Sequence, residues 1–180
     1  MDFSFWLIPE KNQKKFFQKI IDNLAQKYSS CSFIPHLTIY YIPPQNKKNL
    51  EIKTILKILK ENFNSEEKIN LQFSHLDFSD IFTKTLYCQM KTNQQLINLY
   101  DKFKKFFGNY SDYQLNPHLS LIYKNNMNVE DKKKEIKKLN SLIPKTIIFD
   151  KLSLIIRDKG HIKKETDVLD WKEIIEINLI

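Results

Sequence analysis

Two short stretches of this chain place a histidine two residues before a hydroxyl side chain. The first is PHLTIYY, in which His36 precedes Thr38, and the second is PHLSLIY, in which His118 precedes Ser120. Side chains two positions apart in a β-strand point to the same face of the sheet. If each stretch is a strand, it therefore displays an imidazole and a hydroxyl side by side.

The two stretches are similar enough to suggest an internal repeat. Four of their seven positions are identical, and the histidines are 82 positions apart in a chain of 180 residues. This spacing is close to half of the chain and indicates two halves of similar build. Two such strands, related by a pseudo-two-fold axis, would bring two imidazoles and two hydroxyls around one cavity.

That set of groups suits chemistry on a phosphodiester. A neutral imidazole can take a proton from water, an imidazolium can give a proton to the leaving oxygen, and hydroxyl donors can hold the non-bridging oxygens. Histidine titrates near neutral pH, so one fold can hold one ring in each state. All these groups come from the protein, and we therefore expect neither a metal nor a cofactor.

Composition argues against several other classes of protein. The net charge of +8 comes from lysines in segments with helical periodicity, which is typical of solvated helix faces. Arg157 is the single arginine, so an arginine-rich RNA groove is not indicated. The two glycines are in no dinucleotide-binding or P-loop motif. Cys31 and Cys88 lack metal-binding spacing, and we expect free thiols. With no signal-like start and no membrane-length apolar run, we expect a cytoplasmic globular protein without membrane contact.

Hydrophobic periodicity predicts a mixture of helices and strands. We expect a closing pair of strands around the segment 157–164 and, before it, strands at 2–9, 36–42, 69–80, 83–91 and 117–123. We expect helices at 12–28, 48–63, 92–107 and 129–141. A parallel βαβ rhythm is missing from this order, so the predicted class is α+β with antiparallel sheets.

The paired motifs carry a family resemblance. His-x-Thr/Ser motifs, each on a strand and each preceded by proline, resemble those of the 2H phosphoesterase superfamily, and within it the cyclic phosphodiesterase branch. The resemblance extends from the opening FSFWLIP through Phe33–Thr38 and PHLSLIY to the closing DWKEIIEINL. It implies a single bilobal domain over residues 1–180, in which two pseudo-symmetric lobes, each with one motif, form a central cleft and the helices lie outside.

The same resemblance implies roles for the motif residues. The catalytic pair falls on His36 as general acid and His118 as general base, and the phosphate-binding hydroxyls fall on Thr38 and Ser120. Members of the branch hydrolyse ADP-ribose 1″,2″-cyclic phosphate and nucleoside 2′,3′-cyclic phosphates. We therefore expect a metal-independent, monomeric cyclic phosphodiesterase that takes a small cyclic phosphate nucleotide or an RNA end.

The family's aromatic walls, which stack on the substrate, fall on Trp6 and Tyr123. Strict alternation puts Tyr123 with Leu119 and Leu121, on the strand face opposite His118. A twist or bulge in the strand would reconcile this alternation with the role that the resemblance implies. Without one, Tyr123 is a core residue. Trp6 has the same alternative, a buried tryptophan of the core.

Two alternatives for the function stay open. Other members of the superfamily act on RNA ends or cyclic oligonucleotides, and motif and fold are common to them. The fold could also serve as a nucleotide-binding or RNA-binding module, although a binder needs no pair of proton-transfer groups. His75, which shares a strand face with Asp77, lacks the proline and hydroxyl context, and His161 falls in the predicted turn; we assign neither to the site.

Overall fold

The computed structural model describes residues 1–44, 50–157 and 163–180, which form an antiparallel sheet of seven strands surrounded by helices. The strand order is β1-β2-β5-β4-β3-β6-β7, and β1 also pairs with β6. Every pairing is antiparallel. The strands are β1 (Asp2–Pro9), β2 (Leu37–Ile42), β3 (Ile69–Phe78), β4 (Leu86–Met90), β5 (His118–Ile122), β6 (Thr146–Arg157) and β7 (Lys172–Asn178).

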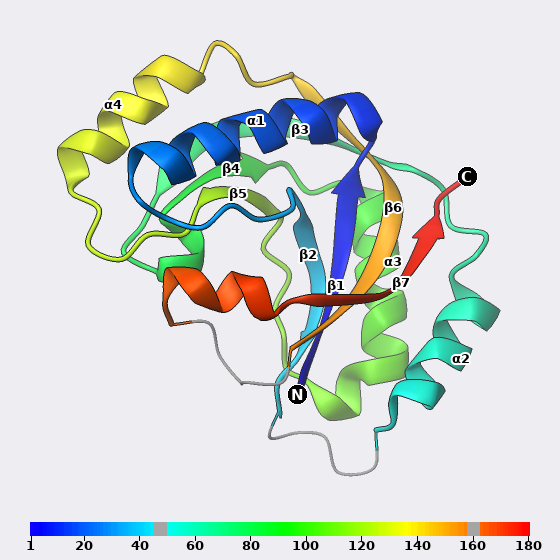
Figure 1. Ribbon diagram of the computed structural model, residues 1–180. Coiled ribbons are helices and arrows are strands. Elements are labelled where there is room, and N and C mark those ends of the chain that lie inside the picture. Colours follow the sequence, from blue (N-terminus) through cyan, green and yellow to red (C-terminus); the bar gives the residue numbers. More distant parts are fainter. Residues whose placement is uncertain (45–49, 158–162) are drawn as a thin grey trace.

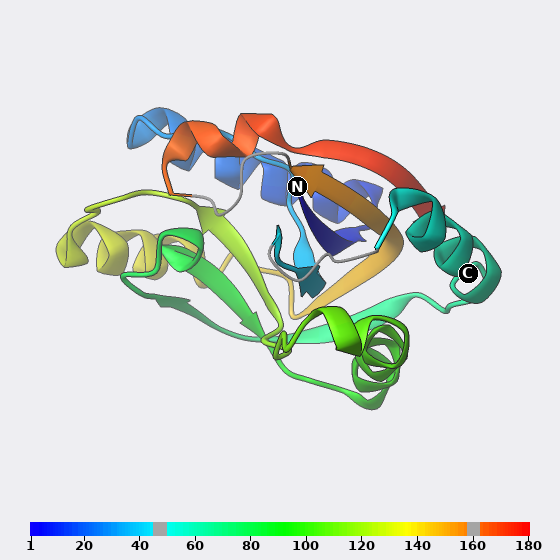
Figure 2. The same ribbon diagram turned by 90° about the horizontal axis from the view of Figure 1, so that it is seen from below.

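The long strand β6 joins two parts of this sheet. Its first residues, 146–149, pair with β3, and its later residues pair with β1 and β7. One part therefore contains β7, β6, β1 and β2, and the other contains β6, β3, β4 and β5. In Figure 2 the green strands of the second part lie to one side of the blue and orange strands of the first. The two parts meet again where β2 pairs with β5.

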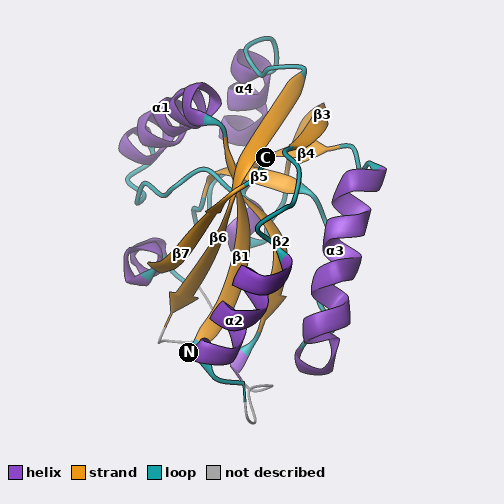
Figure 3. Cartoon of the chain, turned by 90° about the vertical axis from the view of Figure 1, so that its right-hand side faces the viewer, coloured by secondary structure: helices purple, strands orange, loops and turns teal. Residues whose placement is uncertain are grey.

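The helices lie around the outside of the sheet (Figure 1). Figures 1 and 3 show α1 and α4 toward one end of the molecule and α2 and α3 toward the other. Buried side chains of α1 recur at spacings of three and four residues, the period of a helix with one face on the core. The α-helices are α1 (Lys11–Lys27), α2 (Ile52–Asn62), α3 (Gln94–Phe107) and α4 (Val129–Leu139).

The predicted α+β class with antiparallel strands is confirmed, and the predicted elements are present with shifted ends. The first motif's strand begins at Leu37, so His36 lies immediately before β2. The helix predicted at 48–63 begins at Ile52, and residues 45–49 lie outside the described residues. Residues 158–162 of the turn predicted at 157–164 lie outside the described residues. A short 3₁₀ helix, Glu165–Asp170, precedes β7, and its first turn is held by the Asp167 side chain. His161 lies outside the described residues.

Two further expectations concern the chain as a whole. Cys31 and Cys88 are free, as predicted. Within the ranges that the structure describes, no helix combines the length and the apolar character that a membrane span requires. A cytoplasmic location stays a prediction.

Candidate active site

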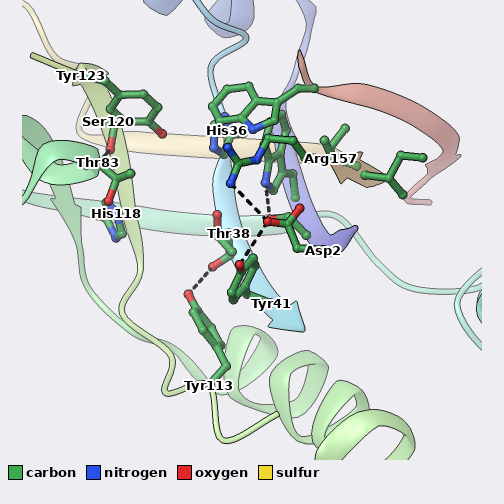
Figure 4. A pocket seen from close by; sticks show the side chains of 15 residues that line it. Asp2, His36, Thr38, Tyr41, Thr83, Tyr113, His118, Ser120, Tyr123 and Arg157 are labelled. Carbon is green, nitrogen blue, oxygen red and sulfur yellow. Dashed lines mark hydrogen bonds and ion pairs between the residues drawn. The ribbon is translucent and has the colours of Figure 1, made fainter. Parts of the chain in front are cut away.

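A cavity of about 330 Å³ is lined by fifteen residues from both parts of the sheet. Six of them are the residues that the sequence predicted, namely Trp6, His36, Thr38, His118, Ser120 and Tyr123. Figure 4 shows the residues of the second motif on one side of this cavity and those of the first motif nearer its centre. The structure thus brings all six predicted residues together.

The two motifs meet because their strands are neighbours. Leu37 of β2 pairs directly with Leu119 of β5, and each leucine stands between the histidine and the hydroxyl of its motif. Both leucines are buried in the main core, so the side chains on either side of them point to the opposite face, into the cavity. An antiparallel pair centred on these leucines relates the two motifs by a local two-fold axis.

Both imidazoles are held in the same way. Nδ1 of His36 lies 2.6 Å from the carbonyl oxygen of Ile34, and Nδ1 of His118 lies 2.7 Å from that of Asn116. A carbonyl only accepts, so Nδ1 carries the proton in each neutral ring and Nε2 is the nitrogen that remains for chemistry. The proline between donor and acceptor has a fixed φ, which restricts the direction of the preceding carbonyl. The Pro-His step therefore sets the tautomer of each ring.

His36 is buried among aromatic rings. Its ring centroid lies 3.6 Å from that of Trp6, with the planes 8° apart, and Trp171 meets it edge-on at 5.5 Å. Burial lowers the pKa of His36 from 6.5 to about 3, although the hydrogen bond to Ile34 acts in the opposite direction. The face of an indole attracts cations, so Trp6 also favours the protonated ring. At pH 7 in the open cavity, His36 is neutral.

His118 has neighbours of a different kind. Burial lowers its pKa to about 4, and the positive charge of Lys84 acts in the same direction. Lys84 Nζ lies 4.3 Å from the ring centroid of Tyr87, and Tyr87 meets the His118 ring edge-on at 5.5 Å. The cation on this side disfavours the imidazolium, so it keeps His118 neutral, with Nε2 unprotonated, in the free protein.

The indole of Trp6 packs against one face of the His36 imidazole. A β-bulge between Phe5 and Trp6 interrupts the pairing of β1 with β2, and the indole Nε1 donates a hydrogen bond of 2.6 Å to Ser4 Oγ. One face of the indole is covered by the His36 ring. The structure places Trp6 on the cavity wall, and its predicted role in stacking on a substrate stays a prediction.

The two motif hydroxyls differ in their surroundings. Thr38 is half-buried, and its backbone carbonyl accepts a hydrogen bond from the Tyr113 hydroxyl. Ser120 is buried, and its Oγ donates to the backbone carbonyl of Thr83 at 2.7 Å. A hydroxyl has one proton, so Ser120 must release Thr83 before it can donate to a bound phosphate.

A register shift in β5 resolves the conflict over Tyr123. Tyr87 of β4 pairs with Ser120 and Leu86 pairs with Ile122, so Leu121 is an extra residue, and the expected bulge is present. Leu121 and Ile122 both lie in the main core, so the alternation that continues from Ile122 turns Tyr123 toward the cavity. The ring lies parallel to that of Phe33, with centroids 4.1 Å apart, and it lines the cavity. Burial raises the pKa of Tyr123, while a hydrogen bond with the Ser120 side chain acts in the opposite direction. Tyr123 is therefore both buried and part of the site wall.

The same cavity contains a polar cluster that was not predicted from the sequence. Arg157 Nη2 lies 3.4 Å from Asp2 Oδ2, and the Tyr41 hydroxyl donates to the same oxygen at 3.2 Å. Alternation along the first strand could have indicated Asp2, because it shares a face with Trp6. The pairing with Arg157 joins residues 155 positions apart and has no local signal. Thr83, Tyr113 and Trp171 also line the cavity without having been predicted.

The remaining polar clusters are elsewhere. His75 Nε2 lies 3.9 Å from Asp77 Oδ2 in an exposed pair that does not line the cavity. Across residues 1–44, 50–157 and 163–180, no three His, Cys, Asp or Glu side chains are grouped as metal ligands would be. The described cavity offers two imidazole Nε2 atoms, with hydroxyl and guanidinium donors around them.

Comparisons with known proteins agree with this architecture. The family model described as "Cyclic phosphodiesterase-like protein" matches residues 1–179, whereas no curated protein matches the sequence. A Thermus thermophilus protein is 9% identical with a TM-score of 0.61, and 99% of this chain and 98% of that chain are covered. A structure described only as a phosphoesterase is 12% identical with a TM-score of 0.58, over 99% and 98% of the two chains.

E. coli LigT in its apo form is 12% identical with a TM-score of 0.56, and the likeness covers 99% of this chain and 96% of that chain. Similarity at these identities shows a common fold, so this chain has the fold of E. coli LigT. Family membership rests on the family model, because that model matches residues 1–179 of the sequence. This chain belongs to the cyclic phosphodiesterase-like protein family.

Proposed function

We propose that the protein hydrolyses a small cyclic phosphodiester by paired-histidine acid and base catalysis, with no metal. The observation that carries this proposal is the local two-fold axis through the β2 and β5 pairing, which directs His36, Thr38, His118 and Ser120 into one cavity. We further propose that residues 1–180 form one domain of two lobes, each with one motif, and that the protein is a monomer.

The proposed reaction uses one histidine in each protonation state. Nε2 of His118 takes a proton from water as the water oxygen attacks phosphorus, and the phosphorus bond to one ribose oxygen breaks. Nε2–H of His36 gives its proton to that leaving oxygen, so the product is a ribose phosphate monoester. Thr38 and Ser120 donate to the non-bridging oxygens as negative charge develops on them.

The neighbours of the two rings support this division of roles. His36 faces the indole of Trp6, which stabilises a protonated ring. His118 is near the cation Lys84, which stabilises a neutral ring. Burial lowers the pKa of both rings, to about 3 for His36 and about 4 for His118. A bound phosphate anion opposes this effect, because a nearby negative charge favours imidazolium.

The size of the cavity supports a small substrate. About 330 Å³ is near the lower end of ligand pockets, which run from about 300 to 1,000 Å³. E. coli LigT, which shares the fold, has been crystallised in complex with phosphate and with 3′-AMP. We therefore propose a nucleoside 2′,3′-cyclic phosphate or ADP-ribose 1″,2″-cyclic phosphate as substrate.

Hydrolysis of adenosine 2′,3′-cyclic phosphate, followed by chromatography of the products, tests the proposal. We expect turnover by the parent protein and a loss of roughly 10²- to 10⁴-fold in kcat/KM for His118→Ala. The matched control is His75→Ala, which removes an exposed histidine outside the cavity and should keep parent activity. If the protein binds the nucleotide without forming product, and His36→Ala binds it equally well, the fold serves as a binding module.

A further inference from the structure

Among the described residues that line the cavity, one group has a permanent positive charge, and neither motif supplies it. Arg157 is the only arginine of the sequence, its side chain is 3% exposed, and it lines the cavity. Asp2 and Tyr41 lie beside it. Figure 4 shows these three side chains grouped apart from His118 and Ser120. The guanidinium of Arg157 therefore lies on a different part of the cavity wall from His118 and Ser120.

A structural ion pair is an incomplete explanation of this cluster. Burying two charges is costly, and an ion pair repays the cost when its geometry is good and its other donors are satisfied. The contact here is a single Nη2 to Oδ2 distance of 3.4 Å, whereas an arginine that serves only a carboxylate typically makes two parallel hydrogen bonds. A guanidinium has several N–H donors, so within the part of the chain that the structure describes this contact leaves donors for another anion.

The partners of Asp2 show how the cluster is organised. Asp2 Oδ2 accepts from both the Arg157 guanidinium and the Tyr41 hydroxyl. The carboxylate thus holds the Nη2 end of the guanidinium, as supporting groups do around a binding site. This contact reduces the conformational entropy that the arginine loses when it binds a ligand.

We propose that Arg157, held by Asp2 and Tyr41, forms a second anion subsite, which binds a phosphate on the 5′ side of the ribose that carries the cyclic phosphate. The proposal rests on the proposed function and narrows its substrate class. In a nucleotide the 5′ carbon and the ring of a 2′,3′-cyclic phosphate are on different sides of the ribose, so the two anions reach different walls of one cavity. ADP-ribose 1″,2″-cyclic phosphate has such a phosphate on the reacting ribose, and a nucleoside 2′,3′-cyclic phosphate lacks it.

Equilibrium binding of two ligands without a cyclic bond tests the subsite independently of turnover. Adenosine 2′-phosphate and adenosine 2′,5′-bisphosphate differ only by the 5′-phosphate, and calorimetry gives the ratio of their dissociation constants. For the parent protein we expect the bisphosphate to bind roughly 10- to 100-fold more tightly, as for hydrogen bonds between charged groups. The ratio cancels general effects of a substitution on the cavity.

The variants are chosen so that an unpaired buried charge does not decide the outcome. Asp2→Asn combined with Arg157→Gln removes both charges and should bring the ratio near one. Asp2→Asn alone leaves the arginine without a competing carboxylate and should increase the ratio. An ion pair of purely structural importance would affect the melting temperature of these variants and leave the ratio unchanged.

The proposal is overturned if the parent protein binds the two ligands with nearly equal dissociation constants. It is also overturned if the double variant keeps the ratio of dissociation constants found for the parent. Hydrolysis assays on the same proteins separate it from the proposed function. If the ratio is high and depends on Arg157 while no cyclic phosphate is hydrolysed, the subsite stands and the proposed activity is wrong. If adenosine 2′,3′-cyclic phosphate is hydrolysed and the ratio is near one, the activity stands and the subsite is wrong.

Discussion

Replacing His36 by glutamine should make the stability of the protein less sensitive to acid. The imidazole of His36 is buried against Trp6 and neutral in the folded protein. In the unfolded chain the same ring is in water and becomes protonated as the pH falls through 6.5. Below that pH the unfolded chain binds a proton that the folded protein does not, so stability falls as the pH falls. Glutamine does not titrate, which removes this contribution.

The size of the effect follows from the lowered pKa. With a folded pKa of about 3 and an ordinary value of 6.5, His36 stays neutral in the folded protein throughout the range from pH 7 to pH 5. Each pH unit below 6.5 then costs about 1.4 kcal/mol, so the largest loss at pH 5 is about 2 kcal/mol. We expect a loss of about 1 to 2 kcal/mol.

Urea unfolding at pH 7 and pH 5 measures this difference. The parent protein should lose about 1 to 2 kcal/mol more between the two pH values than His36→Gln does. His75→Gln, the matched change at an exposed histidine, should follow the parent. An equal loss for the parent and His36→Gln would show that the pKa of His36 is not lowered by folding, because the ring would then titrate alike in the folded and unfolded states.

Three further predictions concern the site. Lys84→Met removes a positive charge that lowers the pKa of His118, so an NMR titration should show a higher pKa for His118; an unchanged or lower value would contradict this. Because burial lowers the pKa of both histidines, the protonated ring is scarce at pH 7 in the free enzyme. The bell-shaped profile of kcat/KM should therefore have its maximum below pH 6.5, and a maximum above that pH would count against the mechanism. A chelator such as EDTA should leave kcat unchanged, whereas a loss that zinc or magnesium restores would show that the chemistry was misassigned.

Much of the fold and the motif residues could be predicted from local patterns. Helical and strand periods in the sequence depend on which face of an element meets the core, and that information is local. The same holds for His36 with Thr38 and for His118 with Ser120, because a period of two puts each pair on one strand face. The repeat then indicated that both pairs share one cavity.

The contacts that set the properties of the site could not be predicted in this way. The stacking of His36 on Trp6 depends on a bulge in β1 and on the register between β1 and β2. The pairing of Asp2 with Arg157 depends on how the last long strand lies against the first. Strict alternation assigned Tyr123 to the face opposite His118 because the register shift at Leu121, where β5 pairs with β4, is not visible in the sequence. All three depend on tertiary pairing, which leaves no periodic trace in the sequence.

A double-mutant cycle on the two histidines tests whether His36 and His118 act together in one catalytic step. The assay is hydrolysis of adenosine 2′,3′-cyclic phosphate by the parent, His36→Ala, His118→Ala and the double variant, each shown to be folded by circular dichroism. Groups that act together in one step are not additive. Each single variant should therefore lose roughly 10²- to 10⁴-fold in kcat, and the double variant should lose much less than the product of the two losses. A folded His118→Ala variant whose rate stays within a few-fold of the parent would contradict catalysis by the paired histidines.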